Sequence, residues 1–153
     1  MFHRFAKGTR EVVTAAYTEA KRRGDHKLGT EHLLLGVLTD PAYARLVGTD
    51  LEAARAALHE LDVAAIRAVG IDPGDFQPTT PARWSGRPRF TAAGRDVLRR
   101  ALRDAAQRGS RELDADHLLV ALLGSPRPDP AAELLDQLRV DPAAIRARLR
   151  DAA

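Results

Sequence analysis

The apolar residues in the first half of the chain follow the spacing of helices. From about Phe5 to Arg23 they recur every three or four residues, and Gly24 then ends the pattern as a helix C-cap would. A shorter pattern begins at Thr30, which the sequence presents as an N-cap, and stays apolar almost all round until Pro41 closes it. A third pattern runs from about Asp50 to Val69. The spacing therefore predicts three helical segments, of which the all-apolar one should be buried.

Residues 70–89 break the helical pattern. Four prolines and three glycines fall in this stretch, which is typical of an extended connector. Elsewhere Ala, Leu, Arg and Glu dominate, while aromatic residues make up only 5% of the chain, and this balance favours helix. The connector therefore separates two helical halves.

The pattern of the first half begins again after the connector. A shift of 85 positions, from 5–38 onto 90–123, gives identical residues at 12 of 34 positions without a gap. The identical pairs are Phe5/Phe90, Arg10/Arg95, Val12/Val97, Ala16/Ala101, Ala20/Ala105, Arg23/Arg108, Gly24/Gly109, Leu28/Leu113, His32/His117, Leu33/Leu118, Leu34/Leu119 and Leu38/Leu123. Further on, Asp50 and Arg55 align with Asp141 and Arg146 at an offset of 91, which implies six extra residues in the second loop.

This repetition predicts the fold class. We expect an all-α fold of about eight helices, arranged as two four-helix repeats that pack around a pseudo-twofold axis. The whole chain, 1–153, would form one domain, with repeat one at 1–69, the connector at 70–89 and repeat two at 90–153.

The composition is that of a globular protein. Hydrophobic residues make up 44% of the chain and charged residues 29%, and the absence of cysteine excludes disulfides and thiolate metal sites. The formal net charge is only +3, from 24 basic and 21 acidic residues, although the many arginines raise the pI to about 9.8. The first thirty residues hold no apolar run suited to a signal peptide, and no run is long enough for a membrane span. We therefore expect a soluble, cytoplasmic protein.

Three short motifs carry a resemblance to a known family. They are Met1-Phe2-His3-Arg4-Phe5, Gly29-Thr30-Glu31-His32-Leu33-Leu34-Leu35-Gly36 and Arg89-Phe90-Thr91. Together with the duplication they resemble the Clp N-terminal (Clp repeat) domain, in particular that of ClpC-type AAA+ unfoldases. The resemblance covers essentially the whole chain and implies a compact eight-helix fold with two pseudo-symmetric halves. It also implies a non-catalytic role in receiving substrate proteins, degradation tags or adaptors for a Clp protease, with Clp unfoldase or protease subunits as further partners and no cofactor.

The acid of the Thr-Glu-His motif carries an implied binding site. In ClpC-like members this acid holds the guanidinium of an arginine-phosphorylated substrate, which by position implies Thr30 and Glu31 in repeat one and Asp116 in repeat two. A carboxylate matches the planar guanidinium fork, and a helix N-terminus can accept the phosphate. Helix capping by Thr30 and Glu31 explains the same pair without any ligand. Repeat two departs from the motif, because residues 114–117 read Asp-Ala-Asp-His.

The resemblance also implies a groove between the first helices of the two halves. Phe2 and Phe90 would line it, Arg10 and Arg95 would flank it, and adaptors or cyclic-peptide antibiotics would bind there. The alternatives are that Phe90 is a core residue and that the two arginines are ordinary solvated helix charges.

The residues give little support to catalysis or metal binding. The stretch 24–30 mimics the spacing of a phosphate-binding loop, but it lacks the Lys before Thr30 and follows a helix instead of a strand. His32 and His117 lack metal-ligand spacing, and their matched places in the two halves indicate packing or hydrogen bonding. We therefore expect neither a metal site nor enzymatic activity.

Nucleic-acid binding is the main alternative function. From Arg83 to Arg111 nine arginines face only two aspartates, and Arg95, Arg99 and Arg103 form one helical stripe that could contact phosphates. Apart from Trp84, no base-stacking aromatic residue accompanies the stripe. We therefore rank a nucleic-acid partner second.

A third alternative keeps the fold and changes the role. No ATPase module follows in the chain, so we expect an isolated domain, either a stand-alone protein or a piece of a longer unfoldase. A stand-alone copy could act as a decoy that holds adaptors, tagged proteins or antibiotics away from the unfoldase. The sequence does not separate a decoy from a delivery factor.

Overall fold

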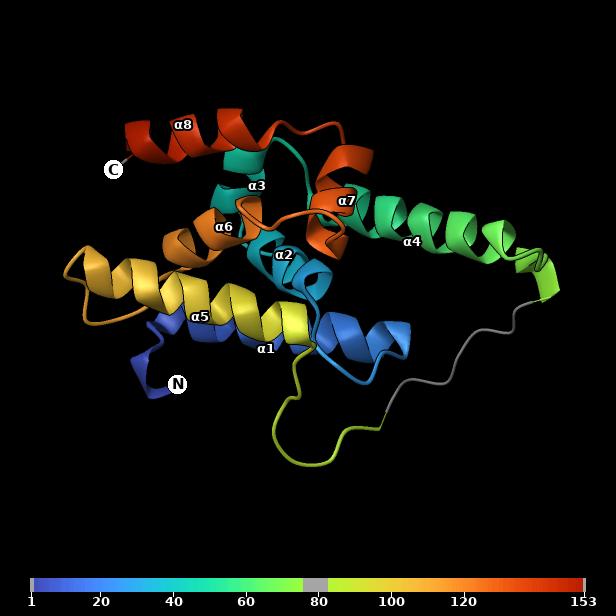
Figure 1. Ribbon diagram of the computed structural model, residues 1–153, viewed down its shortest axis with the longest axis horizontal. Coiled ribbons are helices and arrows are strands. Elements are labelled where there is room, and N and C mark those ends of the chain that lie inside the picture. The colour runs from blue at the N-terminus through green and yellow to red at the C-terminus, as the bar shows by residue number, and fades with distance from the viewer. Residues whose placement is uncertain (1, 76–82, 153) are drawn as a thin grey trace.

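The computed structural model describes residues 2–75 and 83–152, with the Phe2 side chain outside the described part. These residues form eight α-helices and no strand, which confirms the predicted all-α fold (Figure 1). The helices are α1 (Lys7–Arg23), α2 (Thr30–Leu38), α3 (Pro41–Val47), α4 (Leu51–Ala68), α5 (Ala92–Gln107), α6 (Ala115–Leu123), α7 (Pro130–Gln137) and α8 (Pro142–Ala152). Two short 3-10 helices, η1 (Phe2–Arg4) and η2 (Pro73–Asp75), complete the description.

The predicted helix ends are partly corrected by the structure. Gly24 takes the left-handed conformation at the end of α1, with φ 78°, as the C-cap prediction requires. The prediction that Thr30 is an N-cap is wrong, since extended Gly29 is the cap and Thr30 is the first residue of α2. Pro41 opens α3 after the N-cap Asp40, because proline fits the first turn of a helix without losing a hydrogen bond.

The two halves exchange equivalent backbone segments. Phe5 forms an isolated parallel bridge with Leu113, and Phe90 forms the matching bridge with Leu28. The bonds agree in length, because Ala6 N–H donates to the Leu113 carbonyl at 2.9 Å and Thr91 N–H donates to the Leu28 carbonyl at 2.9 Å. At the offset of 85, Phe5 corresponds to Phe90 and Leu28 corresponds to Leu113. The two bridges are therefore equivalent, as a pseudo-twofold axis between the halves requires.

Helices α2 and α6 lie at the centre of the molecule (Figure 1). Their leucines Leu33, Leu34, Leu118 and Leu119 are fully buried, and each contributes roughly 1.5–3 kcal/mol of hydrophobic stabilisation. Gly36 lets α1 and α2 approach closely, since a Cβ there would lie 2.4 Å from the Val12 carbonyl oxygen. Around this core α3 contacts α8 and α4 contacts α7, so each of these two pairs joins one helix from each half.

Candidate ligand-binding sites

Thr30, the first residue of the implied phosphoarginine site, is fully buried between the two halves. Its hydroxyl donates to Asp129 Oδ1 at 2.9 Å and accepts from the backbone N–H of Ala131 at 3.1 Å. Asp129 is itself 4% exposed and caps the start of α7. The Thr30 hydroxyl therefore ties α2 to α7 and is not presented to a ligand.

His32 organises the start of α2. Its Nδ1 accepts from the backbone N–H of Gly29 at 2.9 Å, so the opposite ring nitrogen carries the proton and donates to Asp25 Oδ2 at 2.8 Å. Burial alone would raise the pKa of Asp25, but the bond from His32 and the nearby guanidinium of Arg23 outweigh it and lower that pKa. This histidine makes hydrogen bonds, as its matched placement in the repeat indicates. No group of three or more potential metal ligands occurs within residues 2–75 and 83–152.

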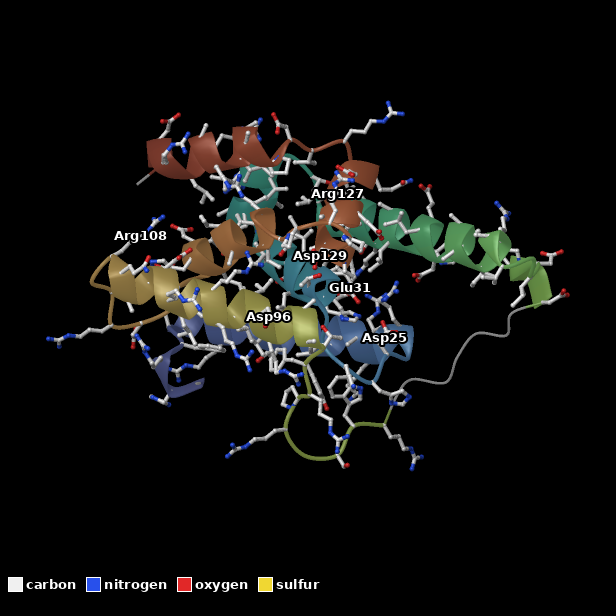
Figure 2. The ribbon with its side chains drawn as sticks, in the orientation of Figure 1. Asp25, Glu31, Asp96, Arg108, Arg127 and Asp129 are labelled. Atoms are coloured by element: carbon white, nitrogen blue, oxygen red, sulfur yellow. The ribbon has the colours of Figure 1, made fainter. Side chains whose placement is uncertain are left out.

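The Glu31 carboxylate has one oxygen that accepts no hydrogen bond from the described residues. Its side chain is 17% exposed and folds back over Gly29, with Oε1 lying 3.5 Å from His32 Nδ1. The other oxygen, Oε2, is buried and has no hydrogen-bond partner among the described residues. Figure 2 shows Glu31 and Asp129 near the centre of the molecule. A buried carboxylate oxygen without a donor favours an incoming N–H group at this place.

The equivalent acid in repeat two is already engaged. Asp116 is exposed at the start of α6, and its Oδ1 accepts from the hydroxyl of Tyr43 at 2.6 Å. Burial and this hydrogen bond raise the pKa of Tyr43, so the phenol stays protonated as a donor. Neighbouring Asp114 caps α6 by accepting from the His117 backbone N–H at 2.9 Å. A ligand for Asp116 would therefore have to share the carboxylate with Tyr43 or displace it.

A cleft of about 620 Å³ lies beside the first turns of α1. Its lining residues are His3, Phe5, Arg10, Val13, Thr14, Arg87 and Pro88, and none of them is acidic. Phe5 is fully buried and forms the floor, so the apolar base of the cleft is rigid. The rim carries the cationic groups Arg10 and Arg87.

Only part of the predicted groove lines this cleft. Arg10 lines it, with Nε donating to the Phe5 carbonyl at 3.0 Å, whereas Arg95 donates to the Phe90 carbonyl at 3.4 Å and lines no described cleft. Phe90 is 9% exposed and belongs to the core, and the Phe2 side chain lies outside the described part of the structure. The two arginines therefore have matched contacts but different surroundings.

A second cleft, of about 380 Å³, was not predicted from the sequence. It runs between α5, α6 and α8 and is lined by Asp104, Arg108, Asp114, Asp116, His117, Val120, Arg146, Leu149 and Arg150. Figure 2 shows Arg108 at the C-terminal end of α5, where this cleft begins. In the sequence, the feature that could have pointed to this cleft is the alignment of Arg146 with Arg55, because it places an arginine at the same position of both repeats.

The basic stripe on α5 is largely used within the chain. Arg95 donates to a carbonyl, and Arg99 pairs with Asp96 at 3.3 Å. Arg103 is exposed. Because two of the three charges have partners within the chain, the stripe offers less to a phosphate backbone than its sequence implies. Nucleic-acid binding stays a prediction, which salt-dependent retention of the pure protein on DNA or RNA would test.

Comparison with known proteins gives the family. The Clp repeat (R) N-terminal domain model matches residues 4–83 and 89–153. An uncharacterized protein of Mycobacterium tuberculosis H37Rv is 36% identical over 123 residues, which are 80% of this chain and 44% of that one. The chloroplastic chaperone protein ClpC1 of Arabidopsis thaliana is 29% identical over 154 residues, covering 97% of this chain and 15% of the relative. The chain thus spans less than half the length of these curated relatives.

A solved structure of the N-terminal domain of the chaperone ClpD from Arabidopsis thaliana shares the fold. It superposes with a TM-score of 0.77 at 20% identity and covers 99% of this chain and 96% of that one. The two interlocked helical repeats and their surface clefts define a helical binding domain. The chain belongs to the Clp repeat N-terminal domain family, whose members bind substrates and adaptors for Clp/Hsp100 unfoldases and are non-catalytic. None of the described helices is both long and apolar enough to cross a membrane.

Proposed function

We propose that this chain binds segments of substrate proteins, degradation tags or adaptors on behalf of a Clp protease system. The observation that carries the proposal is the cleft beside Arg10, which combines an apolar floor with a cationic rim. Hydrophobic contact with Phe5, Val13 and Pro88 would supply affinity, and the guanidinium groups would select acidic side chains. The favoured ligand is a protein segment, or a cyclic peptide, that places an apolar side chain next to an Asp or Glu.

Substituting Arg10 by alanine is expected to weaken binding of such a peptide by about tenfold, since a charge-assisted hydrogen bond contributes roughly 1.5 kcal/mol or more. Peptides that pair Leu or Phe with Glu serve as the probe, with isosteric Gln peptides as the reference, and affinity is measured by fluorescence anisotropy.

The chain offers a matched control for this experiment. Arg95→Ala removes the same kind of contact with a phenylalanine carbonyl but takes nothing from the cleft, so its affinity should stay within about twofold of the unmodified protein. Equal losses in the two variants would show that the cleft does not select the peptide.

Glu31 supports a second binding mode, recognition of phosphoarginine. Its unpartnered Oε2 can accept from a guanidinium, and the start of α2 lies beside it for the phosphate. In repeat two the bond between Tyr43 and Asp116 competes with the same ligand. We therefore place the stronger phosphoarginine site in repeat one, at Glu31, with Thr30 as a structural neighbour.

Glu31→Gln is expected to lower the affinity for a phosphoarginine peptide by roughly tenfold, because one guanidinium bond loses its charge. Asp116→Asn should change it by less than about threefold, since Asp116 already has a partner. Calorimetry on both variants measures the difference. Absence of heat and of NMR shifts from the unmodified protein at millimolar peptide would remove this mode.

Delivery and decoy roles predict different companions in the cell. A delivery factor should be retained together with Clp unfoldase or protease subunits, whereas a decoy should retain adaptors or tagged proteins alone. A pull-down from the host lysate with the unmodified protein and with Arg10→Ala separates the two roles.

A further inference from the structure

The cleft along α6 brings together arginines that have no partner among the residues that the structure describes. Arg108, Arg146 and Arg150 line it, and no hydrogen bond or ion pair engages their guanidinium groups among the described residues. Arg146 is half-buried, so its charge is partly removed from water as well. Its Nη2 lies 3.3 Å from the place that a Cβ of Gly124 would take, and Arg100 Nη1 lies 3.5 Å from the same place. Two guanidinium groups held this close, with no ion pair to a carboxylate among the described residues, favour an anion between them.

The matched positions of repeat one show the same arginines neutralised. Arg23, the counterpart of Arg108, pairs with Asp25 at 3.1 Å and with Asp62 at 2.7 Å. Arg55, the counterpart of Arg146, donates its Nε to Glu19 at 3.1 and 3.2 Å. Repeat one therefore pairs the arginines of its own, smaller cleft of about 190 Å³ with carboxylates of the chain.

The acid that faces the arginine is one methylene group shorter in repeat two than in repeat one. Glu19 corresponds to Asp104 at the offset of 85, and the shorter Asp104 makes no ion pair with Arg146. Asp114 and Asp116 also line the cleft, but Asp114 caps α6 and Asp116 accepts from Tyr43, and neither pairs with an arginine among the described residues. The lining holds three arginines and three aspartates, so selectivity would come from the unengaged guanidinium donors and not from an excess of positive charge.

From these contacts we infer that the cleft along α6 is a second binding site, and that it takes an anionic segment of a partner protein. Carboxylates of Asp or Glu, or a phosphate on a side chain, supply the oxygens that the guanidinium forks accept. Val120 and Leu149 add an apolar floor against which the segment's aliphatic carbons pack. The inference rests on the proposed role in binding protein segments, but it uses a different face from the Arg10 cleft.

The test compares two double variants that lose the same charge. Arg146→Gln with Arg150→Gln removes two of the three cleft arginines, and Arg99→Gln with Arg103→Gln removes two cations of α5 that do not line the cleft. A Gly/Ser peptide carrying several glutamates is the probe, with glutamine and phosphoserine versions beside it. The cleft variant should bind the glutamate peptide about tenfold or more weakly than the α5 variant. Equal losses in both, or equal binding of the glutamate and glutamine peptides, would overturn the site.

A third variant closes the cleft without removing a cation. Asp104→Glu restores the reach of Glu19, so it should pair with Arg146 and reduce binding of the glutamate peptide by about tenfold. Unchanged binding in a variant with an unchanged melting curve would count against the inference, even if the double variant failed to fold.

The phosphoserine peptide identifies the source of the anion. Tighter binding than the glutamate peptide assigns the site to phosphorylated segments, and weaker binding assigns it to carboxylates, while failure of both peptides refutes it. Arg10→Ala, measured in parallel with the Leu–Glu peptides, reports on the proposed function alone. The two proposals can therefore fail separately.

Discussion

Replacing Arg55 by methionine is expected to lower the free energy of unfolding by about 3 kcal/mol. Glu19 lies in α1 with only 3% of its surface exposed, and both of its carboxylate oxygens accept from Arg55 in α4. Without that guanidinium, the buried carboxylate of Glu19 retains, among the described residues, only its ion pair with Arg22, which is 3.7 Å away on a half-exposed side chain. Removing one partner of a buried ion pair destabilises more than removing both, because the remaining charge is desolvated without compensation.

Urea denaturation followed by circular dichroism measures this loss. Arg146→Met is the matched control at the equivalent position of α8, where no carboxylate within residues 2–75 and 83–152 engages the guanidinium. Its free energy of unfolding should change by less than about 0.5 kcal/mol. Glu19→Leu combined with Arg55→Met should recover most of the stability, since an apolar pair of similar volume often replaces a buried ion pair. A control as unstable as Arg55→Met would refute the distinction between the two clefts.

The architecture was predictable because the duplicated residues are those that build the core. Phe5 and Phe90, Leu28 and Leu113 were identified by the offset alone, and the structure places each pair in exchanged backbone bridges. Helical spacing and turn residues also located the ends of α1, α2 and α4 to within a few residues. These features are local or periodic in the sequence, so they can be recognised from a single sequence.

The partners of the site residues were not predictable in the same way. Thr30 was expected to cap its own helix, but its hydroxyl reaches Asp129, which is 99 residues further along the chain. Tyr43 reaches Asp116 across the interface of the halves. Such pairs depend on how the repeats pack, and no spacing rule relates their positions in the sequence.

The unequal clefts show a related limit. The alignment pairs Glu19 with Asp104 as similar acids, yet Glu19 pairs with Arg55, whereas Asp104 makes no ion pair with Arg146. The change of side-chain length is visible in the sequence, but its consequence follows from the distance between two helices. Only the structure supplies that distance.

Removing the Asp129 carboxylate is expected to produce the other large loss of stability. Asp129→Ala deletes the N-cap of α7, where Oδ2 accepts from the Ala132 backbone N–H at 3.1 Å. It also deletes the acceptor of the fully buried Thr30 hydroxyl. The cap contributes about 1 kcal/mol and an unsatisfied buried hydroxyl costs roughly 1–3 kcal/mol, so the free energy of unfolding should fall by about 3 kcal/mol.

The equivalent aspartate in repeat one separates the two contributions. Asp40 caps α3 before Pro41 in the same way, accepting from the Ala42 backbone N–H at 2.9 Å, but it is exposed, and the cap is the one hydrogen bond that its side chain makes among the described residues. Asp40→Ala should therefore cost only about 1 kcal/mol. If thermal and urea unfolding gave equal losses for Asp129→Ala and Asp40→Ala, the bond between α2 and α7 would not stabilise the packing of the two halves.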